Sequence, residues 1–178
     1  MRPLLLFLTS LLLCALLVQL NHVLAGAHVA LFVGGLYLAY AALTLPLRAG
    51  LFATLLAGLL CDARAPLAPD LSALGYAFAH THTLLFLFAH AVVFNLRDRL
   101  PRNESTARVI VALLANLGLF LLFSFMHIGR LPDPASAWPR LIVDLACSQI
   151  FIALVAPWFF ALQARTLALA GAERDTFA

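Results

Sequence analysis

The sequence predicts an all-α, polytopic membrane protein: a compact bundle of about six transmembrane helices in a single domain, residues 1–178. The chain is 64% hydrophobic, more than a soluble domain of this length can hide from water. Its 11 basic residues are all arginines and stand between apolar runs, most of which approach the roughly 20 residues that cross a bilayer. The runs are Pro3–Leu24, Ala27–Leu45, Ala49–Cys61, Leu71–Leu96, Ala107–Met126 and Leu141–Gln163.

The arginines predict an orientation in the membrane. With the N-terminus inside, eight arginines fall on the inner side and three, Arg64, Arg130 and Arg140, on the outer side. Basic residues are enriched in cytoplasmic loops, so we expect both termini to be cytoplasmic and the protein to be multi-pass in the bacterial inner membrane. The inner set is Arg2, Arg48, Arg97, Arg99, Arg102, Arg108, Arg165 and Arg174.

Two runs need a separate decision. Ala49–Cys61 is short, and runs of about 10–14 residues are often re-entrant. If it did not cross, the arginine bias would collapse, so we interpret it as a true span whose Arg48 reaches the interface. The first run also resembles a signal peptide, since Arg2 precedes it and Val23-Leu24-Ala25 places a small residue at the cleavage point. Because it is longer than a usual signal core and a second run follows at once, an uncleaved first span is preferred.

Small residues and polar residues within the runs predict how the helices pack. Small residues recur four apart along Gly26–Gly34 and Gly50–Gly58, a pattern that lets helices approach closely within one bundle. Pro157 should kink the last helix. Arg140 and Asp144 stand four apart and should pair. We expect an inward-facing polar set within the spans: Asn116, Ser148 and Gln149.

The fourth run contains His80, His82 and His90, which could bind metal, relay protons or form hydrogen bonds to other helices. The spacing does not bring metal ligands to one point and no acidic residue lies one turn away. We therefore favour inward-facing histidines that bond to neighbouring helices. The three cysteines are scattered and read as small apolar residues. No catalytic or nucleotide-binding motif is present, so the sequence predicts no enzyme, no cofactor, no metal and no nucleic-acid partner.

Asp62 stands at the end of a predicted helix, where the helix dipole disfavours a carboxylate. It must be held by other groups, such as Arg64 or the amides of the following proline-rich turn, or else be an ordinary loop carboxylate.

Three segments resemble the MreD family of bacterial rod shape-determining membrane proteins. Thr44–Gly50 is similar to that family's L-P-x-R turn, with Pro46 and Arg48 in the matching places. Ala57–Asp62, with Gly58 and Asp62, is similar to its G-x-L-x-D end, which a proline- or glycine-containing loop follows; here that loop contains Pro66. Pro157-Trp158 is similar to a Pro-Trp step in the last span. The family's Leu-Gly step after the acidic residue is replaced by Pro66-Leu67-Ala68.

The resemblance implies a non-catalytic membrane scaffold of the cell-wall elongation complex. Its partners would be an MreC-like membrane protein, the actin-like filament, wall-synthesis enzymes and membrane lipids. Arg97, Arg99, Arg102 and Arg108 would form an inner-surface loop that meets lipid or a partner. Two alternatives remain open: a substrate-binding component of an energy-coupling-factor type vitamin transporter, which would need a small-residue face on the first span, and an intramembrane enzyme.

Overall fold

The computed structural model describes residues 8, 9, 12, 16, 19–21, 23–27, 29–64, 81–99, 105–128 and 134–169. Every regular element among these residues is helical, which confirms the predicted all-α class for this part of the chain. The described residues between 8 and 24 are helical. The elements that follow are η1 (Ala25–Ala27), α2 (Gly34–Thr44), α3 (Leu47–Arg64), α5 (Thr81–Leu96), η2 (Arg97–Arg99), α6 (Ser105–Ile128) and α7 (Pro134–Leu169).

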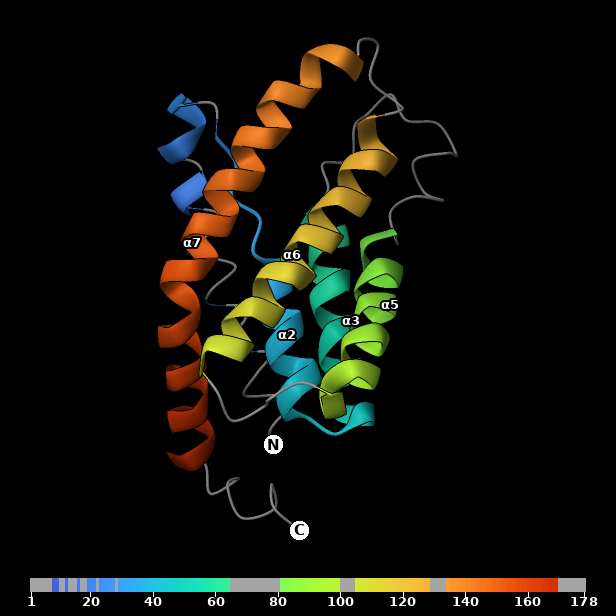
Figure 1. Cartoon of the computed structure of the whole chain (residues 1–178), viewed down its shortest axis with the longest axis vertical. Helices are drawn as coiled ribbons and strands as arrows, with labels where there is room; N and C mark the ends of the chain where they lie inside the picture. Colours follow the sequence, from blue (N-terminus) through green and yellow to red (C-terminus); the bar gives the residue numbers. More distant parts are fainter. Residues whose placement is uncertain are drawn as a thin grey trace.

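The helices form an elongated bundle in which α2, α3, α5 and α6 stand together and α7 runs along α6 (Figure 1). The closest packing is between α3 and α5, between α2 and α6, and between α6 and α7. The end of α2, the start of α3, the end of α5, the start of α6 and the end of α7 all lie at one end of the bundle, the lower end in Figure 1. We call this the arginine end, because it contains Arg48, Arg97, Arg99, Arg108 and Arg165.

The turn between α2 and α3 is set by Pro46. A residue before proline is pushed out of the helical region, and Leu45 is extended, with φ −99° and ψ 151°. Its amide still bonds the Ala41 carbonyl, at 3.1 Å, and the next helix begins with a bond from the Gly50 amide to the Pro46 carbonyl, at 2.9 Å. The chain therefore reverses direction within a few residues at the arginine end.

The small-residue face of α3 packs inside the bundle, as predicted. A Cβ added to Gly50 would lie 2.5 Å from His90 Cε1, and one added to Gly58 would lie 2.5 Å from the Thr83 Cα. Both contacts are with α5. Thr54, between them, is fully buried and satisfies its hydroxyl locally by donating to the carbonyls of Gly50 and Leu51. The glycines thus bring α3 and α5 close together.

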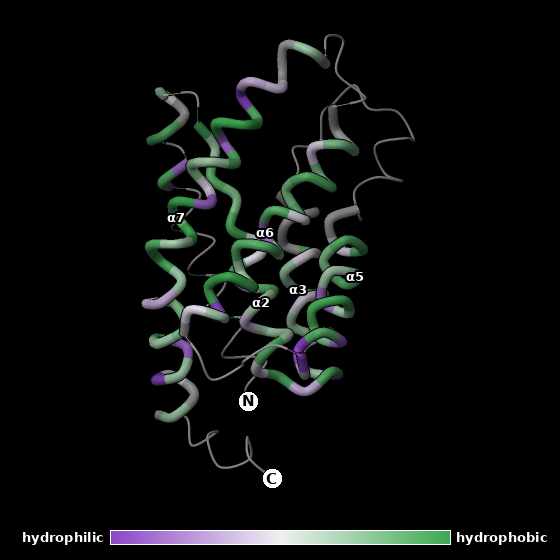
Figure 2. Tube along the Cα trace, viewed as in Figure 1, coloured by the Kyte–Doolittle hydropathy of each residue, from purple (hydrophilic) through white to green (hydrophobic). Residues whose placement is uncertain are grey.

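Two stretches in the described residues are long and apolar enough to cross a membrane: Thr106–Met126 in α6 and Trp138–Thr166 in α7. Only 33% and 28% of their most apolar windows is buried, whereas the core helix of a soluble protein is mostly buried. In Figure 2, hydrophobic residues predominate along the traces of α5 and α7. Shorter apolar stretches lie in Leu47–Leu59 and Thr83–Leu96. A bundle with six spans stays a prediction.

Two predicted features are wrong. The run Ala27–Leu45 is not one helix, since η1 ends at Ala27 and α2 begins only at Gly34. Gly26, Ala30 and Gly34 therefore share no helical face. The proline-containing sequence from Pro132 to Ser136 predicts a loop, but the chain is already helical from Pro134 onward. A proline is well suited to the first position of a helix, because it gives up no hydrogen bond there.

Gly35 offers a test of the α2–α6 packing. A Cβ at this position would lie 2.1 Å from the backbone nitrogen of Asn116, whereas a Cβ at Gly118, also on α6, would meet nothing. Gly35→Ala should lower the free energy of unfolding by about 1–3 kcal/mol, since backbone must move. Gly118→Ala, the matched control, should be neutral or stabilise the helix by up to about 1 kcal/mol. Thermal unfolding of the purified variants measures both, and equal melting temperatures would contradict the packing.

Candidate functional site

The break before α2 is the most unusual backbone in the bundle. Residues 29–33 are neither helix nor strand, and we call them the unwound segment. Buried backbone amides must find partners, and every amide from Val29 to Phe32 does. Val29 donates to the Leu24 carbonyl at 3.3 Å. The other three donate to side chains that lie elsewhere in the chain.

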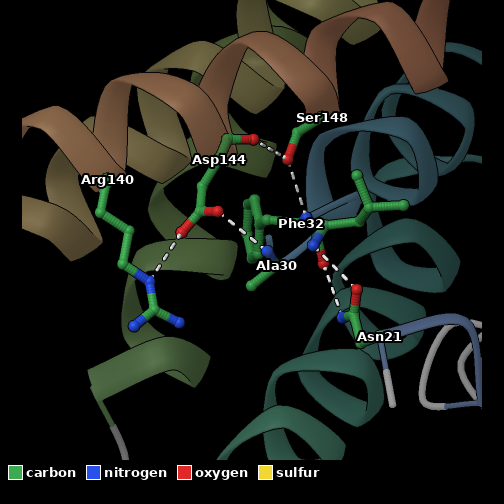
Figure 3. Close-up of polar contacts among 7 residues, drawn as sticks. Asn21, Ala30, Phe32, Arg140, Asp144 and Ser148 are labelled. Carbon is green, nitrogen blue, oxygen red and sulfur yellow. Dashed lines mark hydrogen bonds and ion pairs between the residues drawn. The ribbon is translucent and has the colours of Figure 1, made fainter. Parts of the chain in front are cut away.

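One stripe of α7 supplies two of these acceptors. Asp144 Oδ1 accepts the Ala30 amide at 2.8 Å, and Ser148 Oγ accepts the Phe32 amide at 3.0 Å. The Ser148 hydroxyl in turn donates to the Asp144 carbonyl at 2.6 Å. Arg140 stands one turn earlier, and its Nε lies 3.9 Å from Asp144 Oδ2, which confirms the predicted pair. Figure 3 shows the Asp144 and Ser148 side chains reaching from α7 to the unwound segment, with Arg140 beside Asp144.

Asn21, one of the helical residues before η1, contacts the same segment from another side. Asn21 Oδ1 accepts the Leu31 amide at 2.8 Å, and Asn21 Nδ2 donates to the Leu31 carbonyl at 3.0 Å (Figure 3). A carboxamide is suited to this two-point contact, since it carries a donor and an acceptor side by side. The first helix is also tied to the far part of α7, where Gln163 Nε2 donates to Thr9 Oγ1 at 2.5 Å.

The N-terminus of α2 is capped from α6. Val33, at the N-cap position, makes no side-chain capping bond, although a helix start usually relies on a local Ser, Thr, Asp or Asn. Asn116 Oδ1 accepts the Gly35 amide at 3.1 Å instead. Asn116 and Ser148 are fully buried and Gln149, half-buried, donates to the Leu113 carbonyl. The predicted inward-facing polar set is confirmed.

The arrangement holds backbone in place. Asp144 and Ser148 are occupied by backbone contacts rather than aimed at an open cavity. Within the described part of the chain, no three His, Cys, Asp or Glu residues come close enough to hold a metal ion. A small apolar hollow between α6 and α7, about 30 Å³ in volume, is lined chiefly by aromatic and aliphatic side chains, among them Phe120 and Trp138.

The predicted inner-surface residues have different surroundings. Pro46 and Arg48 are exposed at the α2–α3 turn, and Arg99 is exposed in η2. Arg97, by contrast, is half-buried: its guanidinium donates to the Leu45 carbonyl at 3.3 Å, and its Cζ lies 3.7 Å above the centre of the Phe94 ring. Arg108, in the first turns of α6, is half-buried. Arg102 lies outside the described residues.

His90 is fully buried against Gly50, and its ring stacks on Phe94 with centroids 6.0 Å apart. The inward direction predicted for it is confirmed. The expected hydrogen bond to another helix is not found, because neither ring nitrogen of His90 has a partner among the described residues. His80 and the side chain of His82 lie outside the part that is described.

The other family-like residues fall on two helices. Asp62 is in the last turn of α3, but its side chain and Pro66 lie outside the described residues. Pro157 and Trp158 lie on the outer side of α7, and Trp158 is 80% exposed. The next two residues, Phe159 and Phe160, are buried with ring centroids 5.9 Å from that of Tyr40. α7 continues through Pro157, and Figure 1 shows that its two halves lean in different directions.

Sequence reasoning missed the roles of Asn21 and Arg97. Asn21 lies in the first apolar run, where a carboxamide calls for a partner, but its local sequence does not indicate which one. Nothing in the local sequence of Arg97 links it to Leu45, 52 residues away, so the sequence predicts the same surface position for Arg97 as for its neighbours.

Comparison with known proteins adds no relative. The chain matches no protein-family model, no curated protein and no solved structure.

Asp144 allows the network to be tested with two substitutions. Asp144→Ala leaves the Ala30 amide without its acceptor and should lower the free energy of unfolding by about 1–3 kcal/mol. Asp144→Asn keeps an oxygen acceptor and should lose less. Chemical unfolding of the purified variants gives the comparison. Equal stability of the alanine variant and the parent would show that the contact is not needed.

Proposed function

We propose that this chain is a multi-pass membrane protein that acts as a non-catalytic scaffold of bacterial cell-wall elongation, as the MreD family does. Its partner would be an MreC-like membrane protein in the inner membrane. The observation that carries the family part of the proposal is the turn Thr44–Gly50. Its sequence resembles the family's L-P-x-R turn, and Pro46, Leu47 and Arg48 are all exposed there.

The membrane part rests on the polarity of α7. This helix turns its polar residues inward, since Asp144, Ser148 and Gln163 are buried. It exposes large apolar residues on the opposite side, at 55–80% of their surface: Ile142, Ile150, Leu154, Trp158 and Leu162. Such a distribution suits an apolar solvent and is costly in water. A membrane setting also explains why the amides of residues 29–32 all have hydrogen-bond acceptors. Non-helical backbone at membrane depth is tolerated only where other protein groups bond to it.

The scaffold role rests on rigid, mutually packed helices and an occupied polar network. Gly50 and Gly58 serve contacts within the chain. Among the described side chains, the surfaces left for a partner include the exposed turn at Pro46–Arg48 and the outer side of α7 at Trp158. We assign the MreC-like partner to the Asp62 end, because a carboxylate in the last turn of a helix needs specific partners to offset the dipole.

Reporter fusions test the orientation. A fusion at Asp70 should report the outer side and one at Asn103 the inner side, because this arrangement leaves the arginine end inside. The two fusions control each other, since each has the opposite expected result. An outer signal at Asn103 would remove the short α3 span and contradict the membrane arrangement.

Loss of the gene tests the function. In the bacterium that carries it, deletion should turn rod-shaped cells round, and the tagged chain should co-purify with an MreC-like protein. Asp62→Asn and Asp62→Ala should each reduce that co-purification several-fold at an unchanged protein level. Asp70→Asn, the same charge change eight residues further along, is the control.

Two results would contradict the proposal. Normal cell shape after deletion, together with no MreC-like protein in the purified material, would remove the scaffold function. Co-purification of an ATPase and a coupling subunit would favour the vitamin-transporter alternative instead. If the Asp62 variants capture the partner as well as the parent does, the assigned surface is wrong even when the function holds.

A further inference from the structure

The arginine end gathers cations from four separate elements. Arg48 is in the first turn of α3, Arg97 and Arg99 form most of η2, Arg108 is the fourth residue of α6 and Arg165 is near the end of α7. Figure 2 shows hydrophilic residues at the lower ends of α5 and α7, below the apolar middle of the bundle. Among the described residues at this end, five arginines stand against one acidic residue, Asp98 of η2, so the end is cationic.

These arginines differ in burial and in the contacts they make. Arg97 is half-buried and committed to the fold, since it bonds the last carbonyl of the α2 turn and stacks on Phe94. A cation at this place also suits the C-terminal end of α2, where the helix dipole is negative. Arg48, Arg99 and Arg165 are exposed.

Each exposed arginine has an exposed leucine next to it. Leu47 precedes Arg48 and is 43% exposed; Leu96 stands three residues before Arg99 and is 46% exposed. Leu162 stands three residues before Arg165, on the same side of α7, and is 55% exposed. An acidic protein surface would satisfy the cations and leave the leucines in water. A phospholipid satisfies both, because its phosphate meets the guanidinium and its acyl chains meet the leucine.

We propose that Arg48, Arg99 and Arg165, each with its neighbouring leucine, form a docking surface for acidic phospholipids at the arginine end, while Arg97 serves only the fold. The inference rests on the membrane placement in the proposed function. Arginine is suited to the task, since its planar guanidinium can bind a phosphate through two hydrogen bonds. Near an acidic surface a basic residue contributes about 1 kcal/mol, or about fivefold in binding.

Lipid preference of the full-length purified chain tests this surface. The chain, in detergent, is mixed with equal amounts of phosphatidylglycerol and phosphatidylcholine, and bound lipids are counted by native mass spectrometry. The parent should prefer phosphatidylglycerol, and the preference should fall as salt is raised. Arg48→Gln, Arg99→Gln and Arg165→Gln should each weaken it about fivefold, and the triple variant at least tenfold.

Two single variants are the controls. Arg140→Gln removes an exposed arginine from the opposite end and should leave the preference unchanged. Arg97→Gln should keep the preference but lower the melting temperature, because the Leu45 carbonyl loses its partner. Inorganic phosphate at the same concentration should not displace the lipid, since it lacks acyl chains.

Several results would overturn the inference. A parent preference that is absent or insensitive to salt does so without any variant. A folded triple variant that keeps its preference would show that these arginines serve another partner, such as an acidic protein. Displacement by inorganic phosphate would assign a free-anion site. The test uses the chain alone, so a chain that prefers phosphatidylglycerol but captures no MreC-like protein would refute the scaffold function and leave the lipid surface intact.

Discussion

The fold depends on how the unwound segment satisfies its amides. A helix pairs its own backbone, but the unwound segment has left the helix. Asp144, Asn21 and Ser148 pair the amides of residues 30, 31 and 32, and Asn116 caps the helix that follows. Loss of the Asn116 acceptor would leave a buried donor at a cost of about 1–3 kcal/mol, and the part-buried donors of residues 30–32 would each cost less than that one. Because the acceptors come from α7, α6 and the first helix, the segment ties these three helices to α2.

This constraint explains the distribution of polarity in the bundle. The polar side chains inside are used to bond backbone, which leaves the outward positions free to be apolar. Ser148 makes two such backbone contacts with one hydroxyl, which accepts a hydrogen bond from the Phe32 amide and donates one to the Asp144 carbonyl. At the arginine end Arg97 plays the same part for the α2–α3 turn. In the bilayer setting that we propose, water is not available to replace any of these groups.

The sequence predicted the parts of the fold that follow from local pattern. The long apolar runs predicted α6 and α7, spacing by four predicted the Arg140–Asp144 pair, and the glycines of α3 predicted its close contact with α5. The break within Ala27–Leu45 was not predictable in this way. That run contains no proline, and its acceptors lie as far as 116 residues away in sequence. Gly34-Gly35 was the only local signal, and it read equally well as a packing face.

The site was predictable only as a set of residues. Asn116, Ser148 and Gln149 were recognised as inward-facing because polar residues in apolar runs need partners. Their hydrogen-bond partners could not be predicted. The partner of Asn116, for example, is the Gly35 amide, which lacks a helical acceptor only because the chain is unwound before α2. The three arginines at 97, 99 and 108 looked alike because local sequence does not report that the Phe94 ring and the Leu45 carbonyl lie under only one of them.

The most direct test is the backbone conformation from Val29 to Thr44, measured by NMR from the Cα and carbonyl chemical shifts of the full-length chain. We expect non-helical shifts from Val29 to Val33 and helical shifts from Gly34 onward, with Asp144→Ala changing Ala30 most strongly. Continuous helical shifts from Val29 to Thr44 in the parent would contradict the account, because no amide would then need Asp144, Ser148 or Asn21.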